Sequence, residues 1–109
     1  MKDDLAYLEH VLRCIEKVQG YTKTLTARDF NENELIQDAV IRNIEIIGEA
    51  AKKISKNFKS KYQEIPWKEM SGMRDKLIHD YFGVDVDVVW KTVVEDIPYL
   101  KSLIENIYK

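Results

Sequence analysis

Hydrophobic residues recur along this chain at the spacing of helical turns. The first such stripe lies within residues 3–19, where steps of three and four residues separate Leu5, Leu8, Leu12 and Ile15. This spacing places them on one face of a helix. Asp3 or Asp4 can cap the start of that helix, and Gly20 can end it. A polar stretch, residues 22–33, is expected to follow as a connection.

The second stripe is the clearest in the chain. Its 4-4-3-4-3-4 spacing predicts about six helical turns, formed by Ile36, Val40, Ile44, Ile47, Ala51, Ile54 and Phe58. Another face of this helix carries Arg42, Glu45 and Glu49. Gly48 in its interior costs about 1 kcal/mol relative to alanine. We therefore expect another helix to approach closely at Gly48.

Two more helices are expected after Pro66, which is tolerated in a first helical turn. One is predicted from Trp67 to Tyr81, ending at Phe82-Gly83. Asp85 or Asp87 caps the other, whose stripe is Val86, Val89, Val93, Ile97, Leu100, Ile104 and Ile107. Pro98 interrupts that stripe and crowds the carbonyl of Val94, so we expect a kink there.

The chain shows no strand-like alternation of apolar and polar residues. The pattern therefore predicts an all-α, up-and-down bundle of four or five helices. Its 109 residues are the size of one domain, so we expect a single domain over residues 1–109. No apolar run approaches the roughly 20 residues of a membrane helix. The first ten residues carry acids where a signal peptide would be basic and apolar, so we expect a cytoplasmic protein.

Composition narrows the possible chemistry. The chain has one cysteine and two histidines, which excludes an internal disulfide and a Cys/His zinc site within one chain. We expect Cys14 to fill the core, and His10 suggests no role. The formal net charge of −2 argues against coating nucleic acid through bulk charge. Five lysines and no acid lie within residues 51–61, either as a solvated helix end or as a phosphate-steering cluster.

The segment Met73–Gly83 carries the chemistry. It contains Arg74, His79 and Tyr81 in the pattern Arg-x-x-x-x-His-x-Tyr. Each residue alone has an ordinary structural explanation. Together with its flanks, Ile65–Met70 before it and Tyr81–Asp85 after it, the segment resembles the HepT-like branch of the HEPN superfamily. Further matching stretches are Arg42–Ala50, Val89-Trp90 and Asp96-Ile97-Pro98.

The resemblance implies a HEPN fold and a homodimeric, metal-independent endoribonuclease with no cofactor. It implies the toxin of a two-gene toxin–antitoxin system whose antitoxin is a minimal nucleotidyltransferase. That partner would transfer AMP to the motif tyrosine, here Tyr81. Simple packing of Tyr81 at the end of the bundle is the structural alternative.

The residue types suit cleavage of RNA. A histidine near its usual pKa can move protons in either direction at neutral pH, as removal of the 2′-hydroxyl proton and protonation of the leaving oxygen require. An arginine stays charged and donates two parallel hydrogen bonds to a phosphate. Asp75, four residues before His79 on the same helix face, could accept a hydrogen bond from the imidazole. It could also be an ordinary exposed acid.

Helix geometry raises the question of a dimer. Five residues at about 100° each put Arg74 and His79 roughly 140° apart around one helix. Either the helix ends near His79, or two copies supply the groups jointly around one cleft. Two other interpretations stay open. One is a non-catalytic subunit that binds a nucleotide or the nucleotidyltransferase, and the other is a structural helical dimer with a degenerate site.

Overall fold

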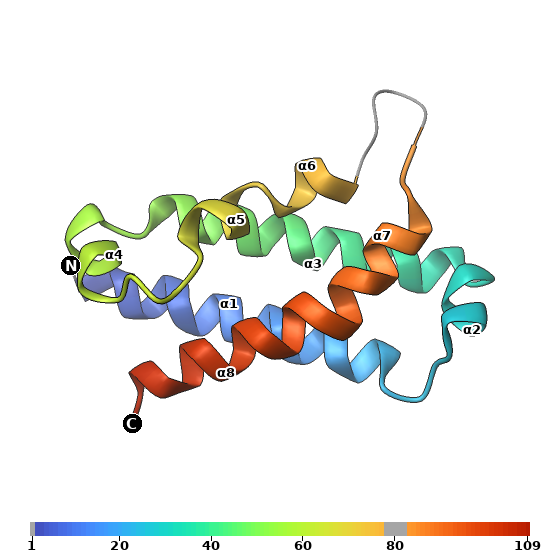
Figure 1. Ribbon diagram of the computed structural model, residues 1–109, viewed down its shortest axis with the longest axis horizontal. Helices are drawn as coiled ribbons and strands as arrows, with labels where there is room; N and C mark the ends of the chain where they lie inside the picture. Colours follow the sequence, from blue (N-terminus) through green and yellow to red (C-terminus); the bar gives the residue numbers. More distant parts are fainter. Residues whose placement is uncertain (1, 78–82) are drawn as a thin grey trace.

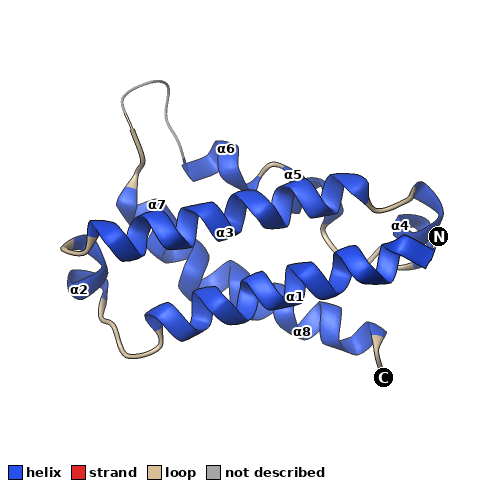
Figure 2. Ribbon diagram, turned by 180° about the vertical axis from the view of Figure 1, so that it is seen from behind, coloured by secondary structure: helices blue, strands red, loops and turns tan. Residues whose placement is uncertain are grey.

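The computed structural model describes residues 2–77 and 83–109, and within these ranges every secondary-structure element is helical. Two long helices, α1 (Lys2–Thr22) and α3 (Glu34–Lys53), run antiparallel and side by side (Figures 1 and 2). A C-terminal arm packs across this pair and comprises α7 (Val86–Lys91), the π-helical η1 (Thr92–Asp96) and α8 (Ile97–Ile107). The short helices are α2 (Ala27–Asn31), α4 (Lys56–Lys61), α5 (Trp67–Ser71) and α6 (Met73–Leu77). The predicted all-α class is confirmed.

The core follows the predicted stripes of α3 and of the C-terminal arm, but the inner face of α1 differs from the prediction. Leu5 is 48% exposed. The buried positions of α1 follow 4-3-4-3 steps and begin with a charged residue: Asp4, Leu8, Val11, Ile15 and Val18. Leu5 faces solvent because Asp4 takes the first inward position. Cys14 is buried as expected, and burial raises the pKa of its thiol.

Asp4 also explains why the second predicted helix is shorter than its hydrophobic stripe. α3 ends at Lys53, Ile54 is extended, and Ser55 caps α4 by accepting a hydrogen bond from Phe58 N. Asp4 holds this junction, since Oδ1 accepts from Ser55 N at 2.8 Å and Oδ2 from Ser55 Oγ at 2.7 Å. Ile54 is still buried. The apolar spacing was therefore correct, but the prediction of one continuous helix was wrong.

The polar connection after α1 also differs from the prediction. α1 continues past Gly20 to Thr22, whose hydroxyl donates to Val18 O at 2.8 Å. The connection contains α2, which begins with a capping box formed by Thr26 and Asp29. Phe30 anchors this short helix in the core, with its ring centroid 5.1 Å from that of Trp90.

In the second half of the chain, the predicted third helix is divided at Gly72 into α5 and α6. The predicted continuation to Tyr81 lies outside the described residues. Gly83 has φ of 114°, a left-handed value that suits the predicted glycine at a helix end. Asp85 caps α7 as expected, accepting from Val88 N.

The final predicted helix is continuous across η1, which lies directly before Pro98 in the first turn of α8. The wider π-helical turn is where the chain accommodates the proline, whose ring crowds the carbonyl four residues earlier. Where the sequence predicted a kink at Pro98, the structure has a π-helical segment directly before α8. None of the described helices combines the length and the hydropathy needed to cross a membrane.

Candidate functional site

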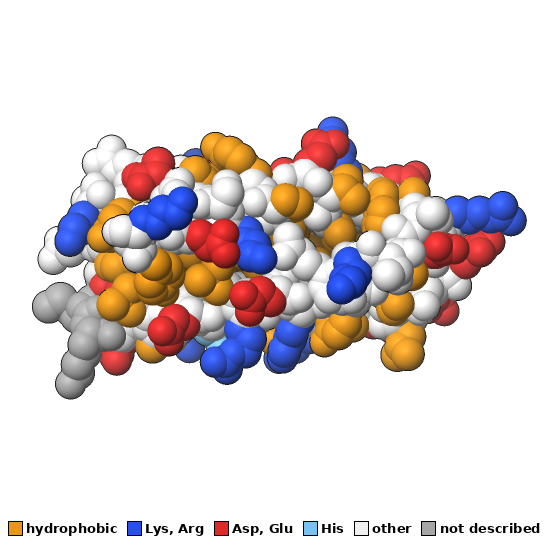
Figure 3. Space-filling view, turned by 90° about the horizontal axis from the view of Figure 1, so that it is seen from below, with side chains coloured by type: hydrophobic (Ala, Val, Ile, Leu, Met, Phe, Trp, Pro, Cys, Tyr) orange, Lys and Arg blue, Asp and Glu red, His pale blue; other side chains and the backbone are white. Residues whose placement is uncertain are grey.

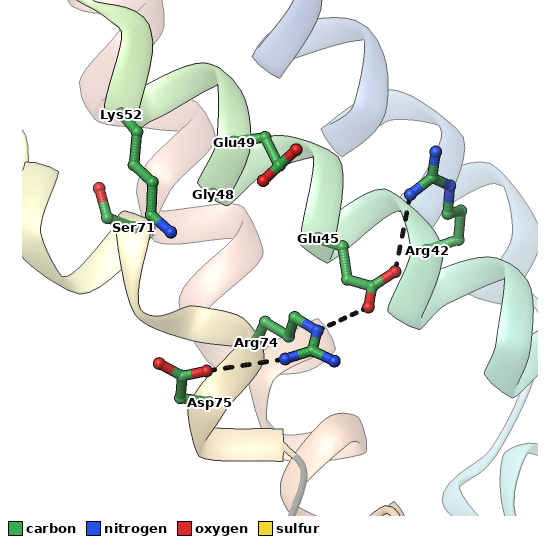
Figure 4. A pocket seen from close by; sticks show the side chains of 8 residues that line it. All are labelled: Arg42, Glu45, Gly48, Glu49, Lys52, Ser71, Arg74 and Asp75. Carbon is green, nitrogen blue, oxygen red and sulfur yellow. Dashed lines mark hydrogen bonds and ion pairs between the residues drawn. The ribbon is translucent and has the colours of Figure 1, made fainter.

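A polar pocket of about 330 Å³ lies between α3 and the α5–α6 pair (Figure 4). It contains the arginine of the predicted motif. The lining residues come from the outer face of α3 and from the facing ends of the two short helices: Arg42, Glu45, Gly48, Glu49, Lys52, Ser71, Arg74 and Asp75. In this pocket, Arg74 of the motif lies opposite residues of α3.

Gly48 allows the two short helices to lie close to α3. A Cβ atom at this position would lie 3.2 Å from Met70 O and 3.3 Å from Ser71 O. Such distances are tighter than most real Cβ contacts, so the bare glycine backbone lets α5 pack where a side chain would push it away. The close helix approach predicted from Gly48 is confirmed.

Burial on both sides of Arg74 determines the direction in which it points. Met73 and Leu77, four residues apart on α6, are 6% and 0% exposed. They fix one face of α6 on the core, which leaves Arg74 and Asp75 on the outer side. Arg74 then reaches across to α3, where it contacts Glu45 (Figure 4).

Arg74 is held by Glu45. Its Nε donates to Glu45 Oε2 at 2.7 Å, a charge-assisted hydrogen bond between residues 29 apart in sequence. The Arg74 side chain is 53% exposed, and that of Glu45 is 26% exposed. This hydrogen bond, followed by the negative charge of Glu45, raises the pKa of Arg74 above its usual value. Arg74 is thus a permanent cation with donors still facing the pocket.

Asp75 lies beside the guanidinium, with Oδ1 3.9 Å from Arg74 Nη1, and its side chain is 83% exposed. Its predicted partner, His79, and the predicted modification site, Tyr81, lie outside the described residues. The described residues on either side of His79 and Tyr81 are close to each other, because Asp85 N donates a hydrogen bond to Leu77 O at 3.0 Å. This hydrogen bond places the last residue of α6 next to the residue that caps α7.

The pocket is not strongly basic. Its lining carries three cations and three anions, namely Arg42, Lys52, Arg74, Glu45, Glu49 and Asp75. The lysine cluster is spread over the end of α3 and over α4, and of its members Lys52 lines this pocket. One face of the molecule shows acidic and basic side chains interspersed (Figure 3). Any attraction for phosphate is therefore local.

Sequence reasoning did not assign a role to Glu45. The available signal was the polar stripe of Arg42, Glu45 and Glu49 opposite the buried face of α3. In the structure, Glu45 contacts both arginines of the pocket, since its Oε1 lies 3.8 Å from Arg42 Nη1. A polar stripe alone could not indicate that α6 would dock against its middle.

Comparison with known proteins gives a consistent result. The family model described as "Ribonuclease HepT-like" matches residues 11–107. A protein of Thermococcus cleftensis named "Probable ribonuclease HepT" is 53% identical over 103 residues, which are 94% of each chain. A Methanocaldococcus jannaschii protein named "Gamma-glutamylcyclotransferase and putative RNase" is 52% identical over 106 residues.

That second match covers 97% of this chain but 48% of the longer relative. No solved structure is a significant match. The family model covers most of the chain and includes the polar pocket, Arg74 and the rest of the predicted motif. The chain therefore belongs to the HepT-like ribonuclease family.

Proposed function

We propose that this protein is a metal-independent endoribonuclease whose site is built on Arg74 and His79. The observation that carries the proposal is the half-exposed Arg74, oriented by Glu45 in a polar pocket directly before the segment that contains His79. Family membership supports the same reaction class. RNA is the substrate under this proposal.

The reaction assigns a different task to each residue. The 2′-oxygen of a ribose attacks the adjacent phosphorus, and the bond from phosphorus to the 5′-oxygen of the next nucleotide breaks. His79 moves the proton lost by the 2′-hydroxyl or the proton gained by the leaving oxygen, as an imidazole can at neutral pH. Arg74 stabilises the additional negative charge on the phosphorane oxygens. Asp75 supports His79 through a hydrogen bond.

The active unit under this proposal is a homodimer. A continuous helix from Arg74 to His79 would aim the two side chains in directions roughly 140° apart. A two-fold axis beside the motif would place both residues of both chains around one cleft. One copy could then supply the arginine, and the other the histidine, at each scissile phosphate.

The proposed ribonuclease activity would be inhibited by modification of Tyr81. The protein would act in the cytoplasm as the toxin of a pair, and a minimal nucleotidyltransferase antitoxin would transfer AMP to the phenolic oxygen of Tyr81. The added phosphate would bring negative charge near Arg74, where an anion can pair with the guanidinium. AMP would thereby compete with the scissile phosphate of RNA.

The function is tested with the purified protein and a single-stranded RNA in EDTA. We expect cleavage to persist in the chelator and to be lost in His79→Ala, because the proton carrier is removed. The melting temperature of the variant serves as the control for folding. Absence of cleavage by the unmodified native chain would instead favour a non-catalytic subunit that binds a nucleotide or the nucleotidyltransferase.

The modification is tested separately by co-expression with the nucleotidyltransferase. Intact-mass spectrometry should show the gain of one or more AMP units, and Tyr81→Phe should show none because it lacks the phenolic oxygen. The Tyr81→Phe protein should also remain active when the partner is present. Equal silencing of Tyr81→Phe and of the native chain would identify occlusion by the bound partner as the mechanism.

A further inference from the structure

We infer that Glu45 is a positioning residue, which holds the guanidinium of Arg74 in the orientation that binds the scissile phosphate. This inference rests on the proposed ribonuclease function and extends it to a residue outside the motif. It starts from the 2.7 Å hydrogen bond between Arg74 Nε and Glu45 Oε2.

The hydrogen bond uses only part of the guanidinium. Arginine has five N–H donors in one plane, and Glu45 engages the donor on Nε. The donors on the two Nη atoms remain, and Asp75 Oδ1 lies 3.9 Å from Nη1, beyond hydrogen-bond distance. A phosphate can therefore bind these donors without displacing Glu45.

Glu45 is suited to this task because its backbone is fixed. It lies near the middle of α3, next to Ile44 and two residues before Ile47, both of which are 0% exposed. Arg74, by contrast, lies on the five-residue helix α6 and has a half-exposed side chain with many rotamers. The long helix thus provides a rigid reference point for a flexible cation.

The hydrogen bond is expected to affect geometry far more than stability. Ion pairs between exposed or half-exposed side chains contribute little to folding. An orientation error of about 1 Å at a reacting centre, however, can lower a rate about a hundredfold. Loss of Glu45 should therefore appear in kcat rather than in the melting temperature.

The matched variants are Glu45→Ala, Glu45→Gln and Glu49→Ala. Glu45→Ala removes the acceptor, whereas Glu45→Gln keeps an oxygen that can accept from Arg74 Nε. Glu49→Ala removes the same charge one turn along α3, and no described contact joins Glu49 to Arg74. This control separates the hydrogen bond from a general change in pocket charge.

We expect Glu45→Ala to lower kcat about ten- to a hundredfold with little change in KM, the range that misplacement of a reacting group produces. Glu45→Gln should recover most of this loss, and Glu49→Ala should not reproduce it. Because Glu45 acts through Arg74, the Glu45→Ala/Arg74→Ala double variant should be no slower than Arg74→Ala alone.

Two results would overturn the inference. One is native kcat in Glu45→Ala when Arg74→Ala is inactive. The other is a Glu45→Gln variant as slow as Glu45→Ala that has also lost the acidic limb of its pH–rate profile, which would make Glu45 a proton carrier instead. Full activity of Arg74→Ala would be a failure of the proposed function itself, and is thus distinguishable from both.

Discussion

Replacement of Arg74 by alanine should lower kcat for RNA cleavage about 10²- to 10³-fold, the usual cost of removing one donor that stabilises developing negative charge. The fold should be retained, because Arg74 is half exposed and its neighbours Met73 and Leu77 hold α6 on the core. Single-turnover cleavage of a defined RNA measures the rate, and circular dichroism checks the helices.

Arg74→Lys is the informative control for this change. It keeps the positive charge but loses Nε and the planar set of donors. It should therefore remain well below native activity if the oriented hydrogen bonds matter as well as the charge. Native activity in Arg74→Ala would exclude this pocket as the site of RNA cleavage.

The same variant also tests whether two copies share a site. An Arg74→Ala protein mixed with a His79→Ala protein can form a dimer in which one cleft receives His79 from the first chain and Arg74 from the second. Activity should then return on mixing. Two inactive proteins that stay inactive after verified subunit exchange would place both residues of each site in one chain.

Gly48→Val should destabilise the protein and reduce its activity together. The first added carbon already lies 3.2 Å from the backbone oxygen of Met70, and valine adds two more. Overpacking of this kind costs about 1–3 kcal/mol. The strain should push α5 from α3 and displace Arg74 from Glu45. Thermal unfolding and the cleavage assay measure the two effects.

Gly20→Val is the matched control, because a Cβ at Gly20 meets no atom within 4 Å. Both glycines lie within long helices, Gly48 in the interior of α3 and Gly20 in the last turn of α1, so valine changes helix propensity in the same direction at each position. Equal effects of the two substitutions would mean that the close approach at Gly48 contributes nothing.

The sequence allowed the helical class and most of the core to be predicted, since apolar spacing reports directly on which helix face is buried. It also identified Gly48 as a point of close approach and Asp85 as one of two candidate caps for α7. Two of the errors lie where a polar side chain outweighs the apolar spacing. Ser55 ends one helix and begins another, and Asp4 takes an inward position expected of a leucine.

The site could be predicted only in part for a related reason. Arg74 stands out because a motif surrounds it, whereas Glu45 lies 29 residues away and has no motif of its own. Its role depends on how α6 docks against α3, which in turn depends on Gly48 and on buried residues of both helices. Such contacts between distant segments are not encoded in local spacing.

The hydrogen bonds between Asp4 and Ser55 also affect the order in which the protein can assemble during translation. Both residues precede α5, α6 and the C-terminal arm in sequence, so α1 can dock on α3 before those parts are synthesised. Glu45 is then already present, while Arg74 is still to be added. Under the proposed function, a chain that ends between these two residues lacks the guanidinium that stabilises the phosphorane, so it could not cleave RNA at this site.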